Sequence, residues 1–343
     1  MPEAPHDDRP RQRYRTALRL LPSYYRTERE EKMVETCLHG IDEQDRDEMR
    51  PALGEMASIA ALAIRTRMGA AGAPARYATL GATVRLFALL SVLLHAASEL
   101  TVRALLLAWF AGAPARDQEL FRGGFTDHGA LPGPYEAALW LLPLAWTVAY
   151  VALLRDHRRT AFVSAVLAAL PDLASAMHDM DAGWGTVAVA FSLATALFSW
   201  LTVLALCCGF HCDAPPARLP LVSTGPALMG TCVLVGASTV VLWPRVADVG
   251  WAEGSAFIAA AAVWLVARRR SPKHVADPAL PLALATLGLA VLVQRILIFA
   301  SSAQNTPGSL VAAFTVQAGI IALLAAALAA TGTRSLTPRF RTG

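Results

Sequence analysis

Long apolar runs separated by short polar segments fill most of the chain, from about residue 84 to residue 330. Most of the runs are close to the roughly twenty residues that an α-helix needs to cross the hydrocarbon core of a bilayer. We therefore expect an all-α fold, a polytopic transmembrane helix bundle with about eight spans. The predicted spans are residues 84–112, 135–154, 160–177, 185–208, 221–243, 252–267, 279–302 and 310–330.

The segment before the first run has a different pattern, with many charged residues and apolar positions at helical spacing. It predicts three short helices, over residues 11–21, over residues 23–40 with Ser23 as the N-cap, and from about residue 51 onwards. Apolar residues of each helix fall on one face, so we expect a small three-helix domain with a thin core.

Gly69, Gly72 and Pro74 interrupt the helical pattern where the composition changes. They place a boundary near residue 76. The expected organisation is a cytoplasmic helical domain over residues 1–76, the transmembrane bundle over residues 77–331 and a basic cytoplasmic tail over residues 332–343.

Composition and charge agree with a membrane location. The chain is 55% hydrophobic and 16% charged, whereas soluble domains carry about 25% charged residues. Its net charge of +4 comes mostly from arginines that flank the apolar runs, so we expect contact with the lipid bilayer and no direct binding of nucleic acid. Basic residues favour alternate loops, with Arg155, Arg158 and Arg159 in one of them, which predicts a bacterial cell-membrane protein with both termini cytoplasmic.

The stretch ALRLLPSYYRTEREEKMVETCL, residues 17–38, resembles the opening of HAAS-type domains. The matching positions are Leu18, Leu20, Leu21, Pro22, Tyr25, Arg26, Glu30, Glu31 and Met33. Lys32 separates the acidic residues from the methionine, whereas these are usually adjacent in the family. HAAS-type domains are small helical modules of bacterial membrane proteins, often beside PadR-type transcription regulators or fused to permease segments. The resemblance implies signalling or regulation at the membrane.

The second predicted helix offers a candidate surface for a protein partner. Arg26, Glu30 and Glu31 are expected on its exposed side, opposite Val34 and Leu38. Charged residues on such a face contribute specificity in binding. We therefore predict that they contact a cytoplasmic partner, such as a transcription regulator or a sigma factor.

Polar side chains inside the predicted spans form a candidate intramembrane layer. They are His95, Glu99, Arg103, Asp172, Gln294 and Arg295, with Gln317 in the last span. A charge at the bilayer centre costs about 2.5–3.5 kcal/mol on insertion scales, so Glu99 and Asp172 should each pair with Arg103 or Arg295. Such pairs could hold the bundle together or could form a site for a ligand, a proton or an ion.

The run CCGFHC contains weak candidates for metal binding, which are Cys207, Cys208, His211 and Cys212. Thiolates and imidazole suit zinc, but this spacing is tight and no second pair of cysteines completes a site. Small, half-buried cysteines are the simpler interpretation, and we expect no metal and no cofactor. The chain also lacks a Gly-rich phosphate loop and the HExxH and GxSxG motifs, so we expect no enzyme.

These features favour an integral membrane regulatory protein whose cytoplasmic helices bind a partner. A transporter or permease component, with a polar site in the outer half of the bundle, is the alternative. It would require a separate ATPase or an ion gradient, because the sequence shows no ATP-binding motif.

Overall fold

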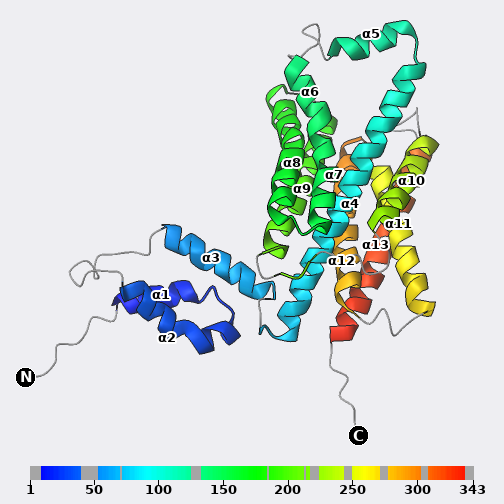
Figure 1. Cartoon of the computed structure of the whole chain (residues 1–343). Helices are drawn as coiled ribbons and strands as arrows, with labels where there is room; N and C mark the ends of the chain where they lie inside the picture. Colours follow the sequence, from blue (N-terminus) through cyan, green and yellow to red (C-terminus); the bar gives the residue numbers. More distant parts are fainter. Residues whose placement is uncertain are drawn as a thin grey trace, which may run out of the picture. The chain divides into compact units, whose positions relative to one another are not determined.

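A computed structural model describes most of the chain (Figure 1). The described residues are 9–39, 53–69, 72–124, 133–183, 185–211, 214–216, 224–242, 249–270, 277–302 and 308–336. Within them the structure is helical and contains no strand, which confirms the predicted all-α fold. The chain divides into two compact units, one comprising Met1–Ala82 with His211–Ala214 and the other Thr83–Phe210 with Pro215–Gly343.

The first unit contains helices α1 (Arg9–Leu18), α2 (Ser23–His39) and α3 (Leu53–Arg67). Tyr14, Leu18 and Leu21 are buried on one face as predicted, and they form the core with Ala17, Val34, Ile59 and Ala63. The backbone carbonyl of Pro22 accepts the N–H groups of Tyr25 and Arg26. Pro22 therefore holds the N-cap position and Ser23 is the first helical residue, so the helix begins one residue earlier than the predicted cap at Ser23 implied.

Two glycines separate α3 from the helix that follows, as the sequence predicted. Gly69 and Gly72 have φ angles of +83° and +82°, a region that side chains with a Cβ rarely adopt. A Cβ at Gly69 would also lie 3.0 Å from the Cα of Ala78. The glycine thus permits both the left-handed backbone and the close approach of the next helix.

The remaining helices overlap the predicted spans, except α5, which was not predicted and lies at one end of the bundle (Figure 1). They are α4 (Ala75–Gly112), α5 (Ala115–Gly124), α6 (Gly133–Leu141), the 3₁₀ segment η1 (Leu142–Leu144), α7 (Ala145–Leu154), α8 (Arg158–Asp181), α9 (Thr186–Gly209), α10 (Thr224–Leu242), α11 (Val249–Arg270), α12 (Ala279–Ser302) and α13 (Gly308–Leu336). Among the described residues, six helices are long and apolar enough to cross a membrane, formed by α4, α6 with α7, α8, α9, α12 and α13. The chain is therefore that of a multi-pass membrane protein. The count of eight spans stays a prediction, because the apolar part of α10 is shorter.

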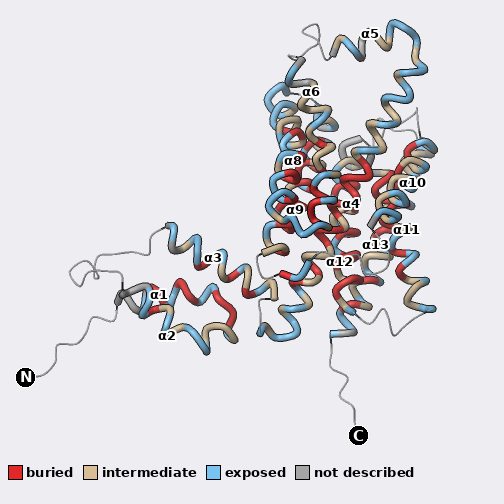
Figure 2. Tube along the Cα trace, in the orientation of Figure 1, coloured by how far each residue is buried: buried red, intermediate tan, exposed pale blue. Residues whose placement is uncertain are grey.

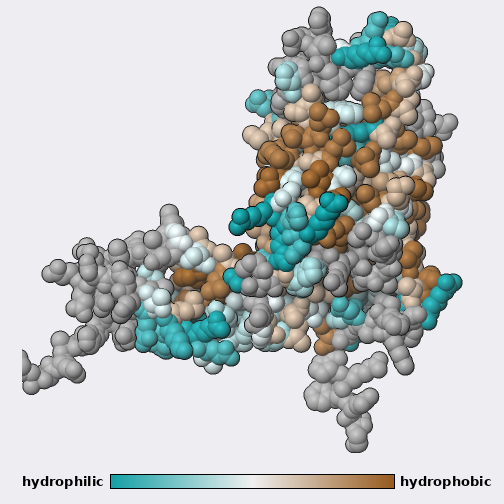
Figure 3. Space-filling view, viewed as in Figure 1, coloured by the Kyte–Doolittle hydropathy of each residue, from teal (hydrophilic) through white to brown (hydrophobic). Residues whose placement is uncertain are grey.

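The bundle has an apolar core, and its exterior is apolar as well, unlike that of a soluble protein. Large apolar side chains lie on its outside, among them Leu204, Val233 and Leu323, which are 58%, 65% and 73% exposed. Buried residues gather along the inner sides of the helices (Figure 2), and apolar residues cover much of the visible surface (Figure 3). Such an exterior fits contact with lipid tails.

Three prolines lie within the predicted spans. Pro143 lies in η1, between α6 and α7, where the α-helix is interrupted. Pro171 lies inside α8. Pro226 falls in the first turn of α10, where a proline is tolerated.

Candidate functional site

His95 on α4 packs against side chains of α7 and α9. The residue is 4% exposed. Its imidazole ring stacks on the ring of Trp146, and the two ring centroids lie 4.6 Å apart. Phe198 lies 4.6 Å from it on another side. The Nε2 atom is 3.3 Å from the hydroxyl oxygen of Thr202. Aromatic contacts and a hydrogen bond thus hold the imidazole in one orientation.

Glu99 and Arg103, one turn apart on α4, form an ion pair. This confirms the predicted pairing of Glu99 and identifies Arg103 as its partner. The Nε of Arg103 also donates to the backbone carbonyl oxygen of Trp140 at 2.6 Å, and the guanidinium carbon lies 5.8 Å from the Trp140 ring centroid. Arg103 therefore joins α4 to α6.

The interruption at Pro143 explains why that carbonyl is available. A carbonyl in an α-helix normally accepts the N–H group four residues later. For Trp140 that residue is Leu144, which lies in η1. Bonds in a 3₁₀ segment reach only three residues back, and the residue three positions after Trp140 is Pro143, which has no N–H group to donate.

Asp172 on α8 accepts a hydrogen bond from the Ser199 hydroxyl on α9, with the oxygens 2.5 Å apart. The sequence predicted an arginine partner instead. Among the described residues Asp172 forms no ion pair with an arginine, so that prediction is wrong for this acid. Glu99 and Arg103 lie within electrostatic range of Asp172, which brings the three charges into one cluster.

A second group of polar residues lies on α11, α12 and α13. The Arg295 side chain is almost fully buried, and its guanidinium carbon lies 4.2 Å from the Phe314 ring centroid and 5.8 Å from that of Trp251. The amide of Gln317 donates to the Trp251 carbonyl at 2.9 Å and to the Ser255 hydroxyl at 3.1 Å. Within the described part of the chain, the polar layer predicted from the sequence is therefore two groups of contacts, one with Glu99, Arg103 and Asp172 and the other on α11, α12 and α13. Gln294, also on α12, is buried.

Several residues of these groups were missed by the sequence reasoning. Ser199 and Thr202 are buried on α9, and Glu253 is buried on α11. Glu253 could have been found as the only acidic residue of the predicted span 252–267. The two hydroxyls gave no such signal, because Ser and Thr are common in transmembrane helices and usually bond their own backbone.

The partner-binding prediction for α2 is partly wrong in its geometry. Arg26 and Glu30 are half-buried and Glu31 is exposed. Arg26, Glu30 and Val34 are spaced by four residues, so they share one side of the helix, and Val34 is in the core. Glu31 is paired with Arg15, its Oε1 lying 2.8 Å from the arginine Nη2.

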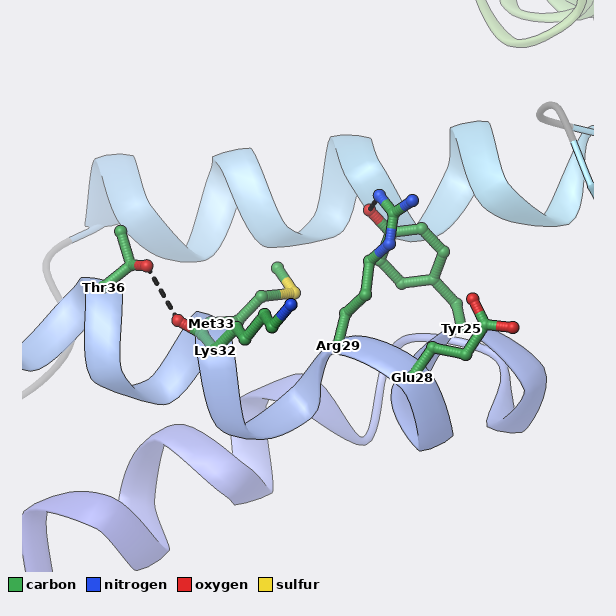
Figure 4. A pocket seen from close by; sticks show the side chains of 6 residues that line it. All are labelled: Tyr25, Glu28, Arg29, Lys32, Met33 and Thr36. Atoms are coloured by element: carbon green, nitrogen blue, oxygen red, sulfur yellow. Dashed lines mark hydrogen bonds between the residues drawn. The ribbon is translucent and has the colours of Figure 1, made fainter.

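A groove of about 670 Å³ lies along α2 and supplies a better candidate surface. Its lining residues are Tyr25, Glu28, Arg29, Lys32, Met33 and Thr36. Figure 4 shows Tyr25, Arg29 and Met33 pointing from α2 toward the neighbouring helix. Arg29 donates to the Tyr25 hydroxyl at 3.2 Å and its guanidinium carbon lies 5.0 Å from the ring centroid. Apolar surface in the groove is thus bordered by charges of both signs.

The cysteine cluster gains no support as a metal site. Cys207 is exposed, Cys208 is half-buried, and both carry free thiols. His211 belongs to the other compact unit, and Cys212 lies outside the described residues. No group of three or more His, Cys, Asp or Glu side chains in the described ranges could hold a metal ion.

Comparisons of the chain with protein-family models, with curated proteins and with solved structures found no match. The functional argument therefore rests on the geometry of the two units.

Proposed function

We propose that this integral membrane protein is a regulatory protein whose N-terminal helices bind a cytoplasmic partner, such as a transcription regulator or a sigma factor. The observation that carries the proposal is that α1, α2 and α3 pack around a core of their own, in a unit distinct from the bundle. A separately packed helical unit on a membrane bundle suits a binding module. The resemblance of residues 17–38 to HAAS-type domains supports the same function.

The surface of α2 supports a protein partner. Interfaces commonly combine an apolar centre with a polar rim. Tyr25 and Met33 supply apolar surface in the groove, and Glu28, Arg29 and Lys32 supply charges of both signs. An amphipathic helix of a partner would bury its apolar face on the first set and pair with the second.

A photo-crosslinking amino acid at Arg29 in the full-length protein tests this proposal in cells. We expect it to trap a transcription regulator or a sigma factor, identified by mass spectrometry of the adduct. The same crosslinker at Gln12, which is exposed on α1, is the matched control and should trap far less of that protein. Adducts that contain no such regulator, or equal yields at both positions, would contradict the proposal.

The cytoplasmic location of both termini is part of the same proposal. It follows from the arginine excess on one set of loops. Arg159→Cys and Arg116→Cys, each in a chain without its native cysteines, should differ in labelling by an impermeant thiol reagent in intact cells. We expect label at position 116 only. Label at position 159 only would reverse the topology.

A transporter or permease component is the second candidate, favoured by the cluster of His95, Glu99, Arg103 and Asp172. Ionisable residues inside a bundle commonly mark pathways for ions or substrates. Two observations separate the candidates: a transporter would move a solute across vesicles in response to an ion gradient, or its gene would adjoin that of an ATPase. A regulatory protein would show neither property. The amount of cytoplasmic partner bound to its N-terminal helices would change instead.

A further inference from the structure

The cluster on α4, α8 and α9 holds more acid than base. Glu99 and Asp172 are two carboxyl groups, and Arg103 is the one arginine within their electrostatic range among the described residues. We propose that Asp172 binds a single positive charge, either a proton or a small alkali cation. This goes beyond the proposed function, because it holds whether the bundle senses a signal or transports a solute.

Arg103 is not available to neutralise Asp172. Its Nη1 is paired with the Glu99 carboxylate, and its Nε donates to the Trp140 carbonyl at 2.6 Å. These contacts fix the guanidinium between α4 and α6. With Glu99 and Arg103 cancelling each other, an ionised Asp172 would leave the cluster with one net negative charge.

The charged side chains that act on Asp172 are Glu99 and Arg103. Arg158, Arg159 and His178 lie toward the two ends of α8. Arg295, on α12, packs against Phe314 and Trp251. α4 contributes His95, whose ring is held between Trp146 and Phe198, and α7 contributes Tyr150. The contacting residue of α9 is Ser199, which has a neutral hydroxyl. An uncompensated charge inside a membrane bundle is costly, so a bound proton or cation is the simplest means of balance.

The surroundings of Asp172 fit either form of the bound charge. A hydroxyl can donate to an ionised carboxylate and can accept from a protonated one, so Ser199 accommodates both.

The cluster is not fully enclosed by protein. Asp172 is half-buried, and the Glu99 and Arg103 side chains are 24% and 13% exposed. On a bundle whose exterior faces lipid, a partly exposed charge is costly unless it is balanced.

Infrared difference spectroscopy of the full-length protein in lipid nanodiscs tests the proposal directly. At neutral pH without sodium, we expect a band of a protonated carboxyl group that disappears in Asp172→Asn. Asp156→Asn, at an exposed turn outside the cluster, is the matched control and should keep the band. If the bound charge is a proton, added sodium leaves the band unchanged. If it is an alkali cation, sodium removes the band and radioactive sodium binds to the wild type but not to Asp172→Asn.

Two further variants keep the test independent of folding. Ser199→Ala retains the carboxyl group and should shift the midpoint of titration or the sodium affinity without abolishing binding. Glu99→Gln releases Arg103 to act as counter-ion, so it should abolish binding while Asp172 is intact. The proposal is overturned if the wild type shows neither the band nor sodium binding, or if a folded Asp172→Asn retains either of them.

Discussion

The two compact units use the same kind of element against opposite surroundings. In α1–α3 the apolar side chains Leu18 and Val34 are 1% exposed, while Glu31 and Arg15 lie on the surface. In the bundle Leu323 is 73% exposed and Ser199 is fully buried. The first arrangement is that of a protein in water and the second that of a protein in lipid, so each unit hides the groups that its surroundings solvate poorly.

The comparison also shows that different forces hold the two units together. Burial of apolar surface drives packing in water, but lipid tails are as apolar as leucine and offer no such drive. The bundle accordingly packs small residues, with Ala96, Ala165 and Ala168 fully buried at helix contacts. Close backbone approach and internal polar contacts such as Ser199 with Asp172 therefore add to the apolar core of the bundle.

The largest effect is expected from truncating the core of the N-terminal unit. Leu18→Ala should lower its stability by about 2–5 kcal/mol, because it removes a buried side chain and leaves a cavity. In so small a core this should unfold α1–α3 and leave the bundle intact. Hydrogen exchange of the full-length protein would show loss of protection only in these helices. Leu20→Ala, at a position 42% exposed, is the control, and equal loss in both variants would contradict the core assignment.

The sequence predicted those features that depend on local pattern. The positions of the bundle helices followed from apolar runs, and the need of Glu99 for an arginine partner followed from the cost of a charge in the membrane. Which arginine pairs with it was left open and was given only by the structure. The spacing of four residues between Arg26, Glu30 and Val34 already places them on one side of the helix. The prediction of an exposed face for Arg26 and Glu30 overlooked this spacing.

Contacts between distant helices could not be predicted in this way. Which helix faces Asp172 depends on the order in which the bundle packs, and hydropathy does not encode that order. The approach of Ser199 to Asp172 and the stacking of His95 on Trp146 therefore emerged only in three dimensions. For the same reason Arg295 was expected near the acids, whereas its aromatic contacts are with Phe314 and Trp251.

A lysine placed on each exterior tests the difference in surroundings directly. Leu323→Lys, near the middle of α13, should oppose membrane insertion by about 2.5–3.5 kcal/mol. Leu20→Lys, on the exposed surface of the N-terminal unit, should change stability by less than about 0.5 kcal/mol. Membrane fractionation and thermal unfolding of both variants provide the measurements. Equal tolerance would show that Leu323 does not face lipid.

The Glu99–Arg103 pair should show coupling that salt does not remove. We expect a double-mutant cycle with Glu99→Gln and Arg103→Gln to give an interaction of about 0.5–3 kcal/mol, since the two groups share a contact in a poorly solvated site. Unfolding in detergent at low and high ionic strength would measure it. Additive effects of the two substitutions would show that the pair contributes no interaction energy.

The smallest effect is expected from the same chemical pair on the water-exposed unit. The Nη2 atom of Arg15 and the Oε1 atom of Glu31 lie 2.8 Å apart, and the side chains are 44% and 67% exposed. Pairs of this kind contribute about 0–1 kcal/mol, because water solvates both charges and long side chains lose freedom on pairing. A cycle with Arg15→Gln and Glu31→Gln should therefore give a small coupling that fades in high salt, where exposed charges are screened. The coupling energies of the two Glu–Arg pairs would then differ because one pair lies in the membrane bundle and the other is exposed to water. A salt-resistant coupling at Arg15 and Glu31 as large as that at Glu99 and Arg103 would mean that this face of the N-terminal unit is not in water, and would require a surface that covers it.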